Sequence, residues 1–274
     1  MRNIYAAPFA LYVKGKLPPK DMKILAVVGA RECSAYGMEV AKYVAGMVAK
    51  QGIAIISGLA RGIDTYAHMG ALGVDGITYG VLGCGIDICY PRENIKLYMD
   101  MQNKGCIISE YAPGISPYAC NFPMRNRIIS GLSDGILVIE AREKSGSLIT
   151  VDMGLEQGKD IYAIPGRITD KLSGGCNNLI KMGAKLIASP QDILEEFEFQ
   201  YSNSNQDNNL SLHLLSPEEQ IIYDTLNLNP KHIDEIALET RISIYILMEK
   251  LLEMELKNIV KQSIKNFFII VKQA

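Results

Sequence analysis

Residues 24–31 read ILAVVGAR, five apolar residues followed at once by glycine, alanine and arginine. An unbroken apolar run of this length is typical of a strand buried on both faces of a parallel sheet. The helical spacing of Val40, Val44 and Val48 then predicts a helix over 36–51. A buried strand that passes through a glycine turn into a helix is the starting unit of a doubly wound α/β fold.

The same alternation continues downstream. We predict further strands over 53–56, 78–82, 106–109, 136–140 and 161–164, and helices over 64–72, 94–104, 124–132 and 147–157. Strands that alternate with helices form a mainly parallel sheet covered on both faces. Residues 23–198 are therefore expected to form one doubly wound α/β domain, preceded by a short irregular segment over 1–22.

A second, smaller domain is predicted at the C-terminus. Residues 201–209 read YSNSNQDNN, without apolar periodicity, so 199–212 is expected to be a linker. Ser216-Pro217-Glu218-Glu219 then has an N-cap serine, proline at the first helical position and glutamate at the third. Three helices (217–226, 232–240 and 243–255) and two strands within 258–271 predict a winged-helix domain over 213–274.

Composition sets limits on function. The chain has 274 residues, of which 48% are hydrophobic and 21% charged, as in ordinary globular proteins. It has no apolar run long enough to span a bilayer and no signal peptide at its start, so we expect a cytoplasmic protein without a membrane partner. The six cysteines and three histidines are not spaced as metal ligands, so we expect reduced thiols, no metal and no cofactor. The net charge of −2 does not point to a polyanionic partner.

Polar residues follow several of the predicted strands, at the sheet edge where ligands of parallel sheets bind. Gly29-Ala30-Arg31 comes first, with Ser34 able to cap the next helix or to bond a phosphate. It is not a GxGxxG fingerprint, and a plain strand-to-helix turn is the competing interpretation.

The densest cluster is SGLARGID at 57–64. Ser57 offers a hydroxyl, and the two glycines, Gly58 and Gly62, leave backbone N–H groups accessible. Arg61 offers a bidentate phosphate donor. Asp64 is expected to cap the following helix and to orient Arg61. The competing interpretation is a structural loop in which Arg61 only pairs with Asp64. With little net charge elsewhere, Arg61 is expected to matter more than any surface lysine.

Two further clusters complete the predicted site. Phe122 precedes a predicted helix and is suited to stack on a base, although burial in the core is equally compatible. Arg125 and Arg127 are two residues apart and therefore point to different faces of that helix, one toward a ligand and one toward a structural partner. The stretch 144–147 (Lys144, Ser145, Gly146 and Ser147) opens a helix with a cation, hydroxyls and N–H groups, as anion sites do.

Together these segments resemble the DprA/Smf family of DNA-processing proteins. The resemblance covers roughly 10–198 and is carried by VGAR (28–31), SGLARGID (57–64), VLGCGID (81–87), FPMRNRIISGLSD (122–134), EAREKSGSLIT (140–150) and IPG (164–166). It implies an extended Rossmann-like fold, binding and protection of single-stranded DNA, and help in loading the recombinase RecA during natural transformation. It also implies homodimers and no catalysis. The DNA site would comprise Ser57, Gly58, Arg61, Gly62, Phe122, Arg125, Arg127 and 144–147, to which we add Gly29 and Arg31.

This chain departs from the family pattern in two places. Many members carry an N-terminal helical domain, of which only a segment resembling its end, at 8–15, is present here. Members also often place a basic residue three positions before the phenylalanine of FPxRN, where this chain has Ala119.

The predicted winged helix does not look like a reader of duplex DNA. Residues 213–274 contain seven Lys and Arg against nine Asp and Glu. Its candidate recognition helix begins SIYILMEK at 243–250 and is mostly apolar, whereas groove-reading helices present polar and basic side chains. We therefore expect this domain to contact protein rather than duplex DNA.

Two other functions stay open from the sequence. Rossmann-like enzymes that hydrolyse nucleoside monophosphates to base and ribose phosphate share the layout of glycine loops after strands and carry a PGGxGTxxE pattern. Here SGSLIT at 145–150 and Glu156 have a different spacing, which argues against this phosphoribohydrolase-type activity. A scaffold with a vestigial pocket is the third alternative.

Overall fold

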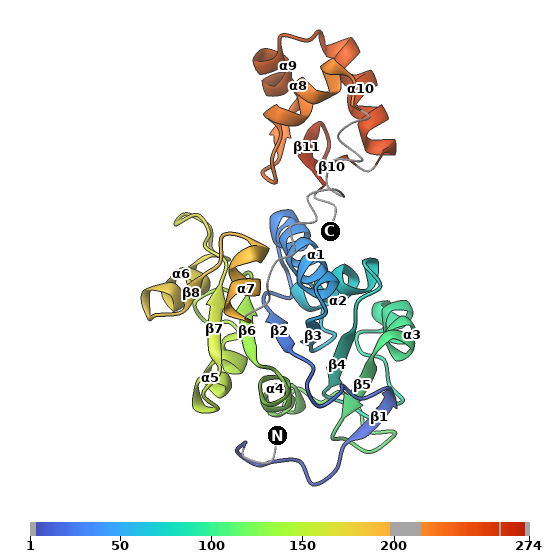
Figure 1. Ribbon diagram of the computed structural model, residues 1–274, viewed down its shortest axis with the longest axis vertical. Helices are drawn as coiled ribbons and strands as arrows, with labels where there is room; N and C mark the ends of the chain where they lie inside the picture. Colours follow the sequence, from blue (N-terminus) through green and yellow to red (C-terminus); the bar gives the residue numbers. More distant parts are fainter. Residues whose placement is uncertain (1–3, 198–214, 258, 272–274) are drawn as a thin grey trace. The chain divides into compact units, whose positions relative to one another are not determined.

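The computed structural model describes residues 4–197, 215–257 and 259–271. The chain divides into two compact units, an N-terminal unit that extends to residue 200 and a C-terminal unit from 201 to 273. Figure 1 shows the first as a sheet with helices around it and the second as three helices with a small sheet. The predicted linker over 199–212 lies outside the described residues. Within the described ranges, no helix combines the length and apolar character needed to cross a membrane.

The N-terminal unit is built on one eight-stranded sheet with the order β1-β5-β4-β3-β2-β6-β7-β8. Its strands are β1 (Tyr12–Gly15), β2 (Ile24–Val28), β3 (Ala54–Ser57), β4 (Thr78–Leu82), β5 (Cys106–Ser109), β6 (Gly135–Val138), β7 (Asp160–Ala163) and β8 (Lys185–Leu186). All neighbouring pairs are parallel except β1 with β5. The predicted Rossmann-like, mainly parallel architecture is therefore confirmed.

Helices cover this sheet on both faces, and as a result all five residues of β2 are buried. The helices are α1 (Ala35–Lys50), α2 (Ile63–Gly73), the 3-10 turn η1 (Arg92–Asn94), α3 (Ile95–Lys104), α4 (Asn121–Leu132), α5 (Leu148–Glu156), α6 (Gly174–Lys181) and α7 (Pro190–Glu196). Ala26 and Val28 of β2 share a core cluster with Ile128 of α4 and Val151 of α5. These two helices therefore pack on the same face of the sheet.

The chain reverses its direction across the sheet at β2. It runs outward from β2 through β3, β4 and β5, then returns to place β6 on the other side of β2. Right-handed crossovers that run in opposite directions place their helices on opposite faces, so α1 and α5 diverge from this point. The loops that leave β2 and β6 separate with them, which creates the crevice where open α/β sheets bind ligands.

The structure corrects the sequence prediction in several places. Residues 12–15, expected to be irregular, form the edge strand β1. Helix α4 begins at Asn121, so Phe122 lies in its first turn and not ahead of the helix. Strand β6 ends at Val138, which leaves Glu140 in the following loop. The short elements α6, β8 and α7 have no counterpart in the prediction.

The C-terminal unit contains α8 (Pro217–Thr225), α9 (Ile233–Thr240) and α10 (Ile244–Leu256) with a sheet of order β10-β11-β9. The strands are β9 (Lys231–His232), β10 (Val260–Ile264) and β11 (Phe267–Ile270). Ser216 and Glu219 form the predicted capping box at the start of α8, with Pro217 at its first position. A separate apolar core holds the three helices on the hairpin and includes Leu247 and Phe268. The predicted winged-helix fold is confirmed.

Candidate functional site

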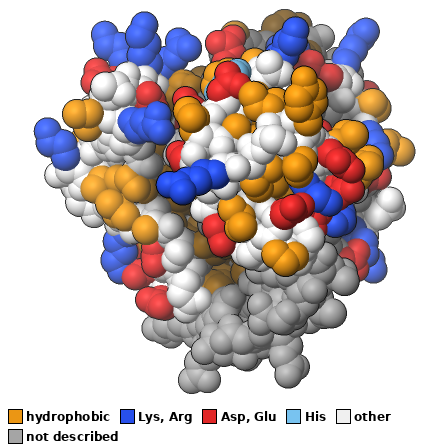
Figure 2. Space-filling view, turned by 90° about the horizontal axis from the view of Figure 1, so that it is seen from above, with side chains coloured by type: hydrophobic (Ala, Val, Ile, Leu, Met, Phe, Trp, Pro, Cys, Tyr) orange, Lys and Arg blue, Asp and Glu red, His pale blue; other side chains and the backbone are white. Residues whose placement is uncertain are grey.

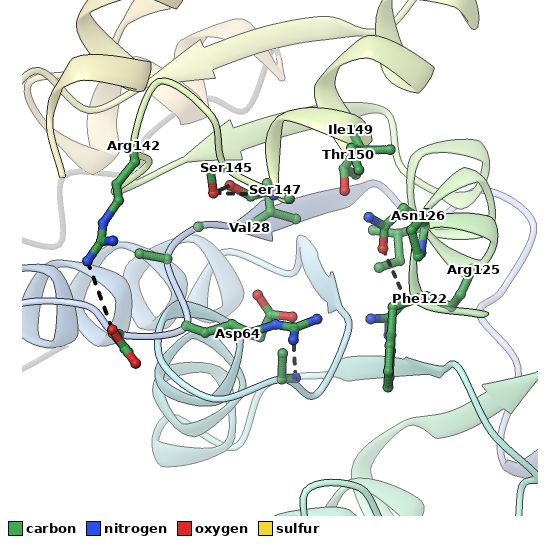
Figure 3. A pocket seen from close by; sticks show the side chains of 18 of the residues that line it. Val28, Asp64, Phe122, Arg125, Asn126, Arg142, Ser145, Ser147, Ile149 and Thr150 are labelled. Atoms are coloured by element: carbon green, nitrogen blue, oxygen red, sulfur yellow. Dashed lines mark hydrogen bonds and ion pairs between the residues drawn. The ribbon is translucent and has the colours of Figure 1, made fainter. Parts of the chain in front are cut away.

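A cavity of about 640 Å³ opens at the switch point of the sheet (Figure 3). Its walls come from the loops after β2, β3 and β6 and from α4. Of the residues predicted for the site, those that line it are Gly29, Arg31, Phe122, Arg125, Lys144, Ser145, Gly146 and Ser147. Ser57, Gly58, Arg61, Gly62 and Arg127 do not line it. The structure thus brings three of the four predicted clusters together around the cavity, whereas the 57–64 loop contributes Ala60 and Asp64 to the lining and none of the residues predicted to bind DNA.

The cavity carries an excess of positive charge although the chain as a whole is slightly acidic. Its lining has four cations, Arg31, Arg125, Arg142 and Lys144, against the carboxylates of Glu32 and Asp64. Arg142 and Glu32 approach each other only to 3.9 Å, with 64% and 91% of their side chains exposed. Such an exposed pair is weak, so the guanidinium of Arg142 is available to an anion.

Arg125 is a structural cation in the floor of the cavity. Its side chain is buried, and its Nη1 donates to the carbonyl of Gly58 at 2.7 Å and to the carbonyl of Val81. Burial lowers its pKa to about 10, an effect that the nearby carboxylate of Asp64 opposes. The guanidinium therefore stays charged at neutral pH, with Nη1 bound to two backbone carbonyls and Nε to the amide oxygen of Asn126 at 3.2 Å.

Asp64 supports the 57–62 loop from inside. Its carboxylate accepts hydrogen bonds from the backbone N–H of Gly58 at 3.1 Å and of Ala60 at 3.4 Å. Burial raises the pKa of Asp64, and the charge of Arg125 together with these N–H donors acts against that shift. The N-cap of α2 is Gly62, without a side-chain cap. The expectation that Asp64 caps this helix and orients Arg61 is therefore wrong.

Arg61 forms an ion pair at the surface instead. Its Nε and Nη2 donate to the two carboxylate oxygens of Glu93 at 2.7 and 3.0 Å. Both side chains are more than half exposed, at 61% and 55%. The alternative interpretation of an Arg61–Asp64 pair is also wrong, because Asp64 points inward and Arg61 outward.

The other predicted residues of this loop have structural roles. The hydroxyl of Ser57 is buried and donates to the carbonyl of Val27 at 2.5 Å. A Cβ at Gly58 would lie 2.5 Å from the guanidinium of Arg125, and Gly62 has a φ of +73°. Only glycine fits at both places, the first because of the close guanidinium and the second because of its left-handed backbone.

Phe122 forms an aromatic part of the cavity wall. Its half-buried ring packs beside Tyr90, with centroids 5.5 Å apart and an interplanar angle of 31°. The guanidinium of Arg31 lies 5.4 Å from the centroid of the Phe122 ring, within reach of a cation–π interaction. A phosphate donor and an aromatic surface thus stand side by side at the cavity wall, on which Phe122 and Arg125 are labelled in Figure 3.

Arg127 faces away from the cavity, as the two-residue spacing from Arg125 predicts for one of the pair. Its Nη2 donates to both carboxylate oxygens of Glu110, at 2.8 and 2.7 Å, and its side chain is only 5% exposed. Its partner is a carboxylate of the chain itself.

The 144–147 loop forms the opposite wall. Ser145 and Ser147 share a hydrogen bond at 2.8 Å between their hydroxyls, and α5 begins directly after them. Lys144 is exposed beside the positive end of this helix. Hydroxyls, an exposed cation and a helix N-terminus together suit a phosphate group.

The first helix, α1, has its N-terminus filled by the chain itself. Ser34 caps it by accepting from the N–H of Gly37 at 3.0 Å. The N–H and hydroxyl of Ser34 in turn donate to the carboxylate of Glu140, at 2.8 and 2.5 Å. Of the two roles that the sequence allows Ser34, helix capping is the one observed.

His68 and Cys84 are buried, so neither side chain is accessible to a ligand in the cavity. His68 is fully buried, its Nδ1 lies 2.6 Å from the hydroxyl of Thr78, and burial lowers its pKa to about 3. None of the described cysteines is paired, and burial raises the pKa of Cys84 to about 11. Within the described residues, no cluster of acidic, histidine or cysteine side chains could hold a metal ion.

Arg142 and Tyr90 line the cavity although neither was among the residues predicted for the site. Arg142 lies only four residues beyond the end of β6, so its position after a strand was an available signal. Tyr90 follows β4 at a greater distance and reaches the site because the loop after β4 folds back, a tertiary effect without a local sequence signal.

Fold and site together define a Rossmann-like protein with a cationic, aromatic-walled cavity and an attached winged-helix unit. Residues 1–198 match the family described as DNA recombination-mediator protein A, and residues 208–263 match the DprA winged helix domain. The chain belongs to this DprA/Smf family of DNA-processing proteins, as the motifs in the sequence predict.

The relatives support this assignment along most of the N-terminal unit. DNA processing protein DprA of Streptococcus pneumoniae is 48% identical over 200 residues, 73% of this chain and 70% of the relative. Protein Smf of Escherichia coli is 45% identical over 193 residues, which is 70% of this chain and 52% of the Escherichia coli protein.

Solved structures agree with the fold. The X-ray structure of the Streptococcus pneumoniae protein matches with a TM-score of 0.68 over 72% of this chain and 69% of that one. DNA processing protein A from Helicobacter pylori, described for its single-stranded DNA binding mode, is 29% identical with a TM-score of 0.64, over 70% of this chain and 89% of that one.

Proposed function

We propose that the chain binds single-stranded DNA in the cavity at the switch point. One observation carries the proposal, the pairing of the Arg31 guanidinium with the Phe122 ring at 5.4 Å. Cationic grooves with aromatic surfaces bind single strands by holding phosphates and stacking bases. The Helicobacter pylori relative, which is described as binding single-stranded DNA, supports the same ligand class.

The donors in the cavity divide into two groups. Arg31, Arg142 and Lys144 are exposed and offer their charge to phosphates, whereas Arg125 is buried, with Nη1 bound to two carbonyls and Nε to Asn126. Arg125 therefore acts by fixing the 58–64 loop and not as a phosphate ligand. A single strand is favoured over a duplex because only unpaired bases expose a face that Phe122 can contact.

Arg31→Ala tests whether Arg31 binds a phosphate, in place of Arg61, which the sequence favours. We expect Arg31→Ala to weaken oligo-dT binding by roughly tenfold or more, since a charge-assisted bond is worth about 1.5–3 kcal/mol. The slope of log affinity against log salt should become shallower by about 0.7 for each phosphate that the variant no longer neutralises. Fluorescence anisotropy across a salt series measures both quantities.

The matched control is Arg61→Ala, which removes an arginine already paired with Glu93 outside the cavity. It should leave affinity nearly unchanged. A decrease as large as that of Arg31→Ala would move the site to the outer loop, and an unchanged affinity in both variants would remove the cavity from DNA binding.

We further propose that the protein protects single-stranded DNA and helps to load RecA on it during transformation, as a homodimer. Family membership supports this proposal. The test is RecA ATPase activity on single strands coated with single-strand-binding protein. The chain should raise the rate, Arg31→Ala should raise it less, and an unchanged rate with the intact chain would contradict the loading role. The molar mass from sedimentation equilibrium tests the homodimer, for which twice the mass of one chain is expected.

We propose that this function involves binding without catalytic turnover. The phosphoribohydrolase-type alternative needs a glutamate beside the nucleotide, but Glu156 is an exposed residue at the end of α5 and does not line the cavity. Of the two carboxylates that line the cavity, Asp64 accepts hydrogen bonds from the N–H groups of Gly58 and Ala60, and Glu32 is 91% exposed beside Arg142. These hydrogen bonds favour a binding site over a hydrolytic one.

A further inference from the structure

We propose that the outer face of α10 in the winged-helix unit docks an amphipathic helix of another protein whose apolar stripe is flanked by Lys and Arg. The docking face, called here the α10 stripe, consists of Tyr245, Met248, Leu252 and Leu256. This inference concerns the C-terminal unit and does not rest on DNA binding in the cavity.

The α10 stripe is a continuous apolar surface on one side of a helix. Its residues are spaced by three or four positions, so their side chains are neighbours. Their exposed fractions are 88% for Tyr245, 58% for Met248, 59% for Leu252 and 78% for Leu256. From first to last they span about 17 Å at 1.5 Å per residue, which is enough to engage three turns of a partner helix.

The four side chains are not exposed because α10 lacks a packed face. Helix α10 already packs its inner face into the unit through Leu247, Leu251 and Met254, which are all buried. A helix that is apolar on a second face as well has a second surface to bury. Single exposed apolar residues need no explanation, but contiguous ones mark interaction sites. Figure 2, seen from above Figure 1, shows hydrophobic side chains in adjoining groups with acidic and basic ones between them.

The charges beside the α10 stripe are negative on both sides. At 100° per residue, Glu249 and Glu253 border it along one edge and Glu255 along the other. Lys250 pairs with Glu253 at 2.9 Å and Lys257 with Glu219 at 2.6 Å, so these pairs are locally neutral. The negative charge of the two margins therefore comes from Glu249 on one side and from Glu255, which accepts from the N–H of Gln262, on the other. An incoming partner therefore meets an apolar stripe between acidic margins.

These margins select the occupant. Nucleic acid and anionic membranes carry negative charge and would be repelled. In an antiparallel pair of two copies, each margin would face its own equivalent, which opposes Glu249 to Glu249 and Glu255 to Glu255 of the second copy. Charges beside an apolar helix seam decide partner choice, so a helix with basic margins is the complementary partner.

The test uses two synthetic labelled peptides of about 14 residues, long enough at 1.5 Å per residue to cover the stripe. Both have leucines at helical a and d positions; one has lysine and the other glutamate at the flanking e and g positions. Anisotropy titrations with the full chain should show the lysine peptide binding at least tenfold tighter, with an affinity that falls as salt rises.

Variants connect this binding to the stripe. Leu252→Glu should weaken the lysine peptide at least tenfold, and Glu249→Lys should reduce the preference for lysine over glutamate margins. The matched control is Leu155→Glu on α5, where the leucine is 55% exposed but lies in the other unit. It should leave peptide affinity unchanged. Because Leu252 is exposed, circular dichroism should show folded protein in each case; Tyr245→Ala serves as a second, milder variant.

Three results would overturn the inference. They are no binding of the lysine peptide, equal binding of both peptides, and a lysine-peptide affinity that survives both Leu252→Glu and Tyr245→Ala. Self-association that Leu252→Glu abolishes would assign the stripe to a second copy instead. Oligo-dT affinity of the Leu252→Glu protein is a separate readout, so a failed docking test leaves the cavity proposal standing or falling on its own measurement.

Discussion

Replacing Arg125 with leucine is expected to lower the free energy of unfolding of the N-terminal unit by about 2–6 kcal/mol, because two buried carbonyls lose their donor at a cost of about 1–3 kcal/mol each. The variant leaves Asp64 buried without its cation, and it leaves the carbonyls of Gly58 and Val81 without the donor that they share. Urea-dependent hydrogen exchange of the amides in β3 and β4 measures the destabilisation of this unit separately from the winged helix.

Arg61→Leu is the matched control for that experiment, because it makes the same change in an exposed pair with Glu93. No measurable change in protection is expected there. The double variant Arg125→Leu, Asp64→Asn should recover part of the stability, since the amide removes the isolated charge and its oxygen can still accept from the N–H groups of Gly58 and Ala60. If Arg125→Leu is as stable as Arg61→Leu, then the buried guanidinium does not hold the floor of the cavity.

The second large effect is expected on DNA binding. Phe122→Ala should weaken oligo-dT binding by about 5- to 150-fold, because stacking of one base on an aromatic ring is worth about 1–3 kcal/mol. The variant also removes the ring over which the Arg31 guanidinium lies. Anisotropy titrations at fixed salt measure the decrease in affinity.

The salt series distinguishes stacking from charge. Phe122→Ala removes no cation, so the slope of log affinity against log salt should stay as in the parent protein. Phe9→Ala is the matched control, because Phe9 is fully exposed and lies outside the cavity lining. An unchanged affinity in Phe122→Ala, or an equal decrease in Phe9→Ala, would show that the ring does not receive a base.

Most of the fold could be predicted from the sequence because its signals are local. The run at 24–28 is buried on both faces and is apolar throughout, and Ser216 and Glu219 indicate the start of α8 by residues within one turn. Strand β1 could not be found this way. It is short and partly exposed, and it becomes a strand only because the edge of β5 accepts it.

The candidate site shows the same division. The strand ends could be located from the sequence, and three of the four predicted clusters line the cavity. Ion partners could not be assigned, because these are set by distant segments. Asp64 is three positions from Arg61, yet the arginine pairs with Glu93 from η1 while the carboxylate lies near Arg125 from α4. Arg61 and Asp64 are close in the sequence, which suggests an ion pair, but the loop turns between them and directs their side chains to different partners.

The carboxylate of Glu140 has a consequence for selectivity. In many proteins of this fold class, the N-terminus of the first helix after the first parallel strand holds the pyrophosphate of a dinucleotide, so that binding follows the metabolic supply of that cofactor. Here Ser34 and Glu140 fill that position with a hydroxyl and an internal anion. Soluble nicotinamide and adenine dinucleotides would meet repulsion there, so the handling of DNA by this chain is expected to be insulated from the energy and redox state of the cell.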